Sequence, residues 1–241
     1  MQNSRIIATV LAAVLAAFPS GRLEAQAGKR MPVWETLMRA PIPQETMPKI
    51  NVLTLPPVPP APPVPREPGA GHTHAGPVFG YILHGEIENL VEPDPPGIYK
   101  TGEVFYETPL HVHRYLRNVS KTESANVLIF QAGDTGQRNP AIKLLMEEPF
   151  QKTEGHEVSL HRLTLPAGAL SDAPAHSGPG IVYVLEGKIE ASSTADQPKM
   201  YSAGDLFLEP ANRAGLTFKN ASSGEPAKLL LYQVSDKRQK E

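Results

Sequence analysis

Three histidines, His72, His74 and His113, have the residue type and the spacing from which a metal site can be built. His72 and His74 are two positions apart, and residues i and i+2 of an extended segment point to the same side of the chain. Neutral imidazole is a good ligand for iron, copper, nickel and zinc and a weaker one for manganese. If His113 lies on a strand across from the pair, three imidazoles converge. The alternative is that His113 is a core histidine bonded to the backbone.

The chain consists of one unit used twice. Tyr-Ile-Leu-His-Gly-Glu-Ile-Glu begins at Tyr81 and Tyr-Val-Leu-Glu-Gly-Lys-Ile-Glu begins at Tyr183, a shift of 183 − 81 = 102 residues. The same shift holds without a gap over residues 74–131. A repeat of this length indicates two copies of the same domain, and about 100 residues is enough for each to bury its own core.

The two copies differ at the histidines. At the shift of 102, the three candidate ligands fall opposite Pro174, His176 and Gly215. A lone imidazole does not make a useful metal site, because bound ions take three or more protein ligands. We therefore expect a metal site in the first copy and a metal-free second copy.

Short apolar segments divided by turns predict strands in both copies. In the first copy we expect strands over residues 79–83, 86–90, 104–106, 111–116 and 125–130. The 26 prolines and the low aromatic content, 6%, also speak against a helical bundle. Strands at this spacing are typical of a sandwich or a barrel.

Similar lead-in segments precede the two copies. Residues 33–40 are expected to form a short helix or an arm ahead of the first barrel, and residues 142–148 resemble them. The predicted division of the chain is a signal peptide (1–27), a lead-in arm (28–49), a first barrel (50–134), a linker with its lead-in segment (135–156), a second barrel (157–236) and a charged tail (237–241).

The N-terminal segment has the pattern of a cleaved secretory signal peptide. Arg5 precedes an apolar stretch over residues 6–18, and Ala25-Gln26-Ala27 is a small-x-small pattern that export peptidases cut. The stretch is shorter than the roughly 20 apolar residues of a membrane-spanning helix. We expect a periplasmic or secreted protein without membrane contact after cleavage, the alternative being an uncleaved anchor.

Charge argues against nucleic acid as a partner. The formal net charge is −2, with 23 basic and 25 acidic residues, and no basic face stands out in the sequence. Nucleic acid and anionic membrane surfaces attract proteins with a basic patch. There is no cysteine, so the fold has no disulfide bonds.

A proline-rich segment, residues 56–65, precedes the first histidines. Such a run cannot donate the hydrogen bonds of a sheet and is expected to be extended polyproline II. It is either a stiff surface loop, or a docking segment or rim over the site that follows.

Two motifs, taken in order, resemble those of the cupin superfamily in its two-domain form, the bicupin. The first is Gly71-His72-Thr73-His74 followed by Tyr81-Ile82-Leu83-His84-Gly85, and the second consists of Gly102, Pro109, His113 and Asn118. The resemblance covers residues from about 50 to 235. It implies an all-β fold of two tandem cupin (double-stranded β-helix or jelly-roll) barrels. It also implies that His72, His74 and His113 hold one divalent transition metal.

The chain departs from the family pattern at the acidic ligand. That residue should fall at position 78 or 79, which are Val78 and Phe79. Three neutral imidazoles leave a divalent ion its full charge, which favours a small anionic, oxygen-chelating molecule as the remaining ligand. The missing carboxylate weakens the case for manganese and for an oxalate decarboxylase. Iron is the favoured metal, with copper, nickel, zinc and manganese left open.

Three further residues are candidates for the pocket around the histidines. His111 and Tyr115 have the same parity as His113, so they are expected to add a second imidazole or a hydroxyl to the site. Val78 occupies the position of the missing acid. The simpler alternative for each is a place on the rim or surface.

These observations favour an exported bicupin metalloprotein that is a metal-dependent, dioxygenase-like oxidoreductase acting on a small enol, catechol or hydroxy acid. Two alternatives stay open. One is a non-catalytic small-ligand-binding cupin of the cell envelope, and the other is an interaction protein that docks through the proline-rich segment. A bicupin imitates a dimer of single cupins, so a monomer or a homodimer is expected.

Overall fold

The computed structural model describes residues 31–61, 69–134, 140–151, 155–194, 196–211 and 215–236. From Met31 onward the chain forms one compact unit. The predicted signal peptide, the charged tail and residues 62–65 of the proline-rich segment lie outside the described residues. A helix long and apolar enough to cross a membrane is absent from the described part of the chain.

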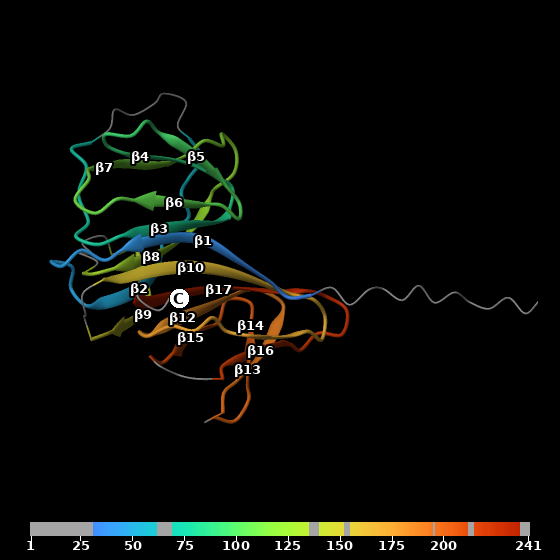
Figure 1. Ribbon diagram of the computed structural model, residues 1–241. Helices are drawn as coiled ribbons and strands as arrows, with labels where there is room; N and C mark the ends of the chain where they lie inside the picture. The colour runs from blue at the N-terminus through green and yellow to red at the C-terminus, as the bar shows by residue number, and fades with distance from the viewer. Residues whose placement is uncertain are drawn as a thin grey trace, which may run out of the picture. The chain divides into compact units, whose positions relative to one another are not determined.

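Every regular element among the described residues is a β-strand (Figure 1). The first half contains β2 (Lys49–Thr54), β3 (Val78–His84), β4 (Glu86–Val91), β5 (Gly97–Lys100), β6 (Val104–Glu107), β7 (His113–Asn118) and β8 (Asn126–Ala132). The second half contains β10 (His156–Leu165), β11 (Leu170–Asp172), β12 (Gly180–Glu186), β13 (Lys188–Ser192), β14 (Lys199–Ser202), β15 (Leu206–Glu209), β16 (Thr217–Asn220) and β17 (Ala227–Asp236). The prediction of an all-β fold is confirmed.

Each half consists of two antiparallel sheets. In the first half their strand orders are β6-β3-β8-β2-β9 and β5-β4-β7, where β9 is Lys143–Pro149. In the second half they are β1-β10-β17-β12-β15 and β11-β16-β13-β14, where β1 is Val33–Pro41. Each half also has its own core cluster, one around Phe105 and Ile82 and the other around Phe218 and Leu163. In each half, two facing sheets enclose a separate hydrophobic core and form a jelly-roll barrel, as the repeat predicts.

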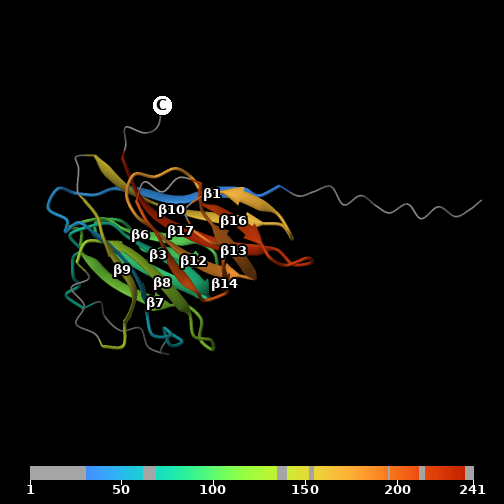
Figure 2. The ribbon, with the colours of Figure 1, turned by 90° about the horizontal axis from the view of Figure 1, so that it is seen from below.

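Each of the two lead-in segments forms a strand that pairs with the half it does not directly precede in the sequence. β1 (Val33–Pro41) pairs along β10 of the second half, and β9 (Lys143–Pro149) pairs along β2 of the first half. In Figures 1 and 2, β1 runs beside β10 in both views. Residues 33–40 are therefore neither a helix nor a free arm. Trp34 packs into the core of the second half and donates a hydrogen bond to Ser171 Oγ at 3.0 Å.

Large apolar side chains from both halves share a third core cluster. Phe79 and Phe130 of the first half meet the fully buried Tyr232 of the second, with ring centroids 6.0 and 5.4 Å from that of Tyr232. Burial of this aromatic surface helps to hold the halves together. The two halves therefore form one folded unit rather than two independent domains.

The asparagine of the second motif braces a turn. Asn118 Nδ2 donates to the carbonyl oxygens of Val58 and Glu123, at 3.1 and 2.6 Å. Asn220, 220 − 118 = 102 residues later, repeats the arrangement with Leu165 and Glu225 at 3.0 and 2.9 Å. The motif residue is structural, and the repeat extends to its individual hydrogen bonds.

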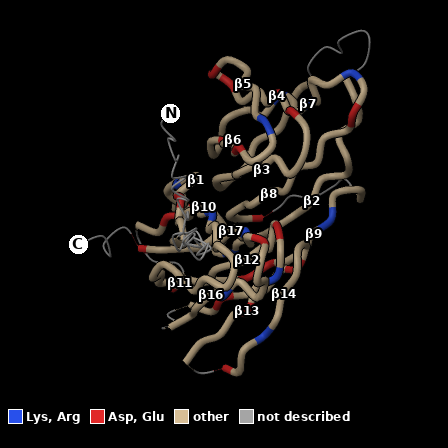
Figure 3. The backbone as a smooth tube through the Cα atoms, turned by 90° about the vertical axis from the view of Figure 1, so that its right-hand side faces the viewer, with Lys and Arg blue, Asp and Glu red and all other residues tan. Residues whose placement is uncertain are grey.

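Charged residues of both signs are interspersed along the described backbone. In Figure 3 the lysine and arginine positions alternate with acidic ones over both halves. Whether the protein avoids nucleic acid stays a prediction.

Candidate metal centre

The three histidines come from a loop and a strand that are joined by the backbone. His72 and His113 form an isolated antiparallel bridge, with His113 N donating to His72 O at 2.8 Å and His72 N donating to His113 O at 3.1 Å. The bridge places the loop that carries His72 and His74 against the first residue of β7. A local pairing over two residues therefore aligns ligands that lie about 40 positions apart in the sequence.

The imidazoles converge as the spacing predicts. Candidate ligand atoms of His72, His74 and His113 all lie within 4.8 Å of one another. Nε2 of His72 is 3.0 Å from Nε2 of His74, and the ring centroid of His72 is 5.0 Å from that of His113. His72 is exposed while His113 is buried, so the cluster is open to solvent on the His72 side.

Gly71 allows the close approach of the His72 loop. Its φ is +77°, and a Cβ at this position would lie 2.6 Å from the carbonyl oxygen of His113. Any other residue would combine an unfavourable left-handed backbone with a clash against main chain. The glycine of the first motif is thus required by the bridge between His72 and His113.

The electrostatics favour the neutral form of His72. Burial, followed by the neighbouring His74 and His113, holds the pKa of His72 below its ordinary value, with Glu107 opposing. Neutral histidine is the form that ligates metal. Both ring nitrogens of His113 are buried without a hydrogen-bond partner. Buried polar atoms are normally satisfied, so a divalent ion fits this residue and this donor set.

Glu107 is a residue of the site that sequence analysis missed. Its side chain is 4% exposed, with Oε2 2.9 Å from Nε2 of His74 and Oε1 3.4 Å from Nδ1 of His113. Pairing of β3 with β6 sets Glu107 directly opposite Val78. A carboxylate therefore reaches the histidines from the neighbouring strand, although position 78 itself carries none.

The remaining pocket candidates are more distant or differently oriented. Val78 is buried in the apolar core of the first half. Tyr115 lies opposite Leu90 while His113 lies opposite Val91, because the register shifts between them. Consecutive residues point to opposite faces of a sheet, so Tyr115 does not share the face of His113. Its ring lies under the guanidinium of Arg117, 4.6 Å away.

His111 occupies the turn before β7. Its backbone N donates to Thr108 O at 3.2 Å, and its Nδ1 is buried without a hydrogen-bond partner. The neighbouring Leu110 has a φ of +64° and donates its backbone N–H to His74 O at 2.8 Å. This turn therefore holds the loop at His74, as the bridge to His113 holds it at His72.

Residues 161–232 match the family model of the cupin domain. Over most of the chain, the structure also superposes on several solved proteins of low sequence identity. The fold is a cupin fold. YhaK from Escherichia coli is 15% identical, with a TM-score of 0.51 over 85% of this chain and 93% of that one. For AerE from Microcystis aeruginosa the values are 14%, 0.52, 83% and 99%.

A candidate glyoxylate-induced protein from Pseudomonas aeruginosa is 15% identical, with a TM-score of 0.54 over 85% of this chain and 83% of that one. At such identities the likeness shows the fold alone. No curated protein sequence matches the chain. The cupin model covers part of the second half only, so the assignment of a first cupin barrel rests on the structure and the internal repeat.

The second cupin barrel retains a histidine and a glutamate where the first has four site residues. His176 Nε2 lies 2.9 Å from Glu209 Oε1, and both side chains are 1% exposed. Burial lowers the pKa of His176, but the Glu209 carboxylate and the Gly178 carbonyl together raise it further, so its pKa lies above the ordinary value. Glu209 stands 209 − 107 = 102 residues after Glu107. That correspondence is the sequence signal that could have identified Glu107.

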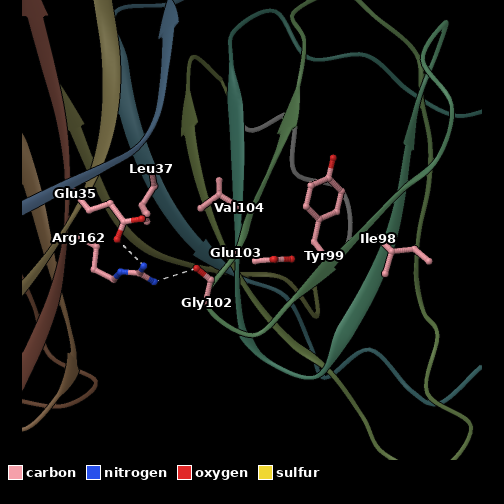
Figure 4. Close-up of a pocket in the computed structure, with 8 residues that line it drawn as sticks. All are labelled: Glu35, Leu37, Ile98, Tyr99, Gly102, Glu103, Val104 and Arg162. Atoms are coloured by element: carbon pink, nitrogen blue, oxygen red, sulfur yellow. Dashed lines mark hydrogen bonds and ion pairs between the residues drawn. The ribbon is translucent and has the colours of Figure 1, made fainter.

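A separate cavity of about 500 Å³ lies where Arg162 of the second cupin barrel meets the β5–β6 turn of the first (Figure 4). Arg162 donates to Glu35 Oε2 at 2.6 Å and to Gly102 O at 3.1 Å (Figure 4). The bond to Gly102 ties the two cupin barrels together, whereas Glu35 lies on β1 in the same sheet as Arg162. The residues that line the cavity include none of the histidines, so it is not part of the metal centre.

Proposed function

We propose that the protein is an exported, metal-dependent cupin oxidoreductase of the dioxygenase type. One divalent transition metal, with iron favoured, would be held by His72, His74 and His113. The observation that carries the proposal is the convergence of their ligand atoms within 4.8 Å around the buried His113, whose ring nitrogens have no hydrogen-bond partner.

Bound metal would supply Lewis acidity toward an oxygen ligand and, for iron, one-electron chemistry with O₂. The chain itself controls access. His72 is exposed and marks the open side. Phe105, two residues before Glu107 on β6, is fully buried, and its ring fills the space over Gly80, where a Cβ would lie 1.9 Å from Phe105 Cζ.

The substrate class we propose is a small anionic oxygen chelator such as an enol, a catechol or a hydroxy acid. A divalent ion beside a single carboxylate, Glu107, retains a net charge of about +1 and attracts one further anionic oxygen. Exposure of His72 allows such a molecule to approach from solvent. The proposal thus keeps the anionic substrate that the sequence pattern suggests.

Oxygen uptake tests this function. The iron-loaded protein is offered a panel of enols, catechols and hydroxy acids under air, beside the His113→Ala variant loaded in the same way. The proposal predicts oxygen consumption with at least one compound and none for the variant. Bound iron without turnover of any panel member would contradict it and favour the non-catalytic ligand-binding cupin.

Export is part of the proposal and rests on residues 5–27 alone. Mass spectrometry of the full chain expressed in a bacterial host tests it. We expect a mature protein that begins at Gly28 in the periplasmic fraction. An intact N-terminus in the cytosolic fraction would contradict export while leaving the metal centre untouched.

A further inference from the structure

We infer that Glu107 is a fourth protein ligand of the metal centre, so that the first barrel offers three imidazoles and one carboxylate. The inference rests on the proposed metal binding and specifies it further. It also departs from the family pattern, in which the acid belongs to position 78 or 79. Here the acid comes from the strand that pairs with that position.

The distances around His74 match those of adjacent metal ligands. Its Nε2 is 3.0 Å from Nε2 of His72 and 2.9 Å from Oε2 of Glu107. Two ligands at right angles around an ion, each bonded at about 2.1 Å, are about 3.0 Å apart. The Glu107 oxygen and the His72 nitrogen thus lie at nearly the same distance from Nε2 of His74.

Burial and charge point the same way. The Glu107 side chain is 4% exposed, and its two oxygens face His74 and His113. A buried carboxylate requires a compensating positive charge. If the imidazoles are neutral ligands, they do not supply that charge. A cation held between the carboxylate and the histidines does.

The second barrel shows what the same two positions do without the other histidines. His176 and Glu209 keep the 2.9 Å separation, and Nδ1 of His176 faces the carbonyl oxygen of Gly178 at 2.5 Å. There the pKa of His176 is raised, and His176 and Glu209 compensate each other's charge as an ion pair. In the first barrel, by contrast, a second imidazole nitrogen, from His72, faces the pair at 3.0 Å. Imidazole nitrogens and a carboxylate oxygen gathered in this way form a donor set that suits a divalent transition metal.

The test is the affinity of the full-length protein for Mn²⁺, measured by competition titration. Glu107→Gln removes the charge and keeps the shape of the side chain. Glu103→Gln, an exposed carboxylate four residues earlier, and Glu209→Gln, its counterpart in the second barrel, are the matched controls. Loss of a hydrogen-bonding partner outside the coordination sphere costs about 10–100-fold in metal affinity. A direct ligand must therefore cost more.

We expect Glu107→Gln to lose more than ~100-fold in Mn²⁺ affinity, with both controls unchanged. A smaller loss would overturn the inference and place the carboxylate outside the coordination sphere. A wild-type protein that binds neither Mn²⁺ nor Ni²⁺ would instead contradict the proposed function, so the two failures are distinguishable.

A measurement on the wild-type chain guards against a variant that does not fold. The protein is labelled with glutamate carrying ¹³C in its side-chain carboxyl group and loaded with Mn²⁺. Electron–nuclear double resonance then reports whether a carboxyl carbon is coupled to the ion. A strong ¹³C coupling supports direct ligation by Glu107. Its absence in metal-loaded protein overturns it.

Discussion

Arg114 donates a hydrogen bond from Nη1 to the carbonyl oxygen of Ala70, 2.8 Å away and two residues before His72. Its Nη2 donates to Glu92 at 2.8 Å. Arg114 directly follows His113, a ligand of the proposed metal centre, so one strand holds both His113 and the loop that brings the exposed His72 to it. The guanidinium thereby positions the loop of His72, a second proposed ligand, through the backbone of Ala70.

Replacing Arg114 by methionine should weaken metal binding while leaving every ligand in place. We expect a loss of about tenfold in affinity, the lower end of the cost of removing supporting groups around a metal. Competition titration measures it. Arg117→Met, which removes an exposed ion pair with Glu88 on the same strand, is the control and should bind as the wild type does. Equal affinities for the two variants would refute the positioning role.

Gly71→Ala should abolish the bridge between His72 and His113. The new Cβ meets main chain at 2.6 Å in a backbone conformation that already disfavours alanine. Gly168→Ala is the matched control, because its φ is +66° but nothing lies within 4 Å of its Cβ. We expect Gly71→Ala to lose more than about 1 kcal/mol of stability beyond the control, and also to lose metal binding. Equal denaturation midpoints with retained metal would show that the loop around Gly71 adjusts to accommodate the added Cβ.

His161 should make the fold sensitive to acid. Burial, then the positive charge of Arg39, lowers its pKa to about 4, with Glu157 opposing and His176 adding to the effect. The unfolded chain binds a proton at this histidine below pH ~6.5, whereas the folded chain binds one only below about pH 4. The folded state therefore loses stability as the pH falls through this window, by at most about 3 kcal/mol.

Urea denaturation at pH 7 and pH 4.5 measures this linkage. The difference in unfolding free energy between the two pH values should shrink in His161→Gln. The control is His84→Gln, whose side chain is 59% exposed and should leave the difference unchanged. An unaltered pH dependence in His161→Gln would show that other groups carry the acid response.

Tyr232→Phe should be neutral or stabilising by up to about 1 kcal/mol. The hydroxyl of Tyr232 is fully buried between the halves and has no hydrogen-bond partner. Removing a buried group that is unsatisfied recovers part of its desolvation cost. Tyr232→Ala, which leaves a cavity, should instead cost about 3–5 kcal/mol. Thermal denaturation checks both, and a clearly destabilised Tyr232→Phe would reveal a partner for the hydroxyl.

The fold and the histidine cluster could be predicted because their signals are local. Two such signals are visible in the sequence: the two-residue spacing of His72 and His74, and the ungapped repeat. A repeat preserves strand order and turn positions together, so agreement at one motif extends to the whole unit. The convergence of the three histidines followed from residue type and spacing, and its restriction to the first half followed from comparing the copies.

The rest depended on pairing that the chain order does not reveal. Glu107 reaches the site through the β3–β6 register, and Trp34 enters the second half because β1 pairs with β10. Tyr115 lies on the wrong face for the site because a register shift breaks the simple alternation of β4 against β7. Long-range register and bulges are decided by packing, so a pattern read along one strand misses them.

Elemental analysis of protein purified without chelators tests whether the three histidines hold a metal. We expect about one divalent transition-metal ion per chain in the wild type and near-complete loss in His74→Ala. His84→Ala, which removes an exposed histidine of the same half, should keep the ion. Equal metal content in wild type and His74→Ala would show that the three converging imidazoles are not where the metal binds.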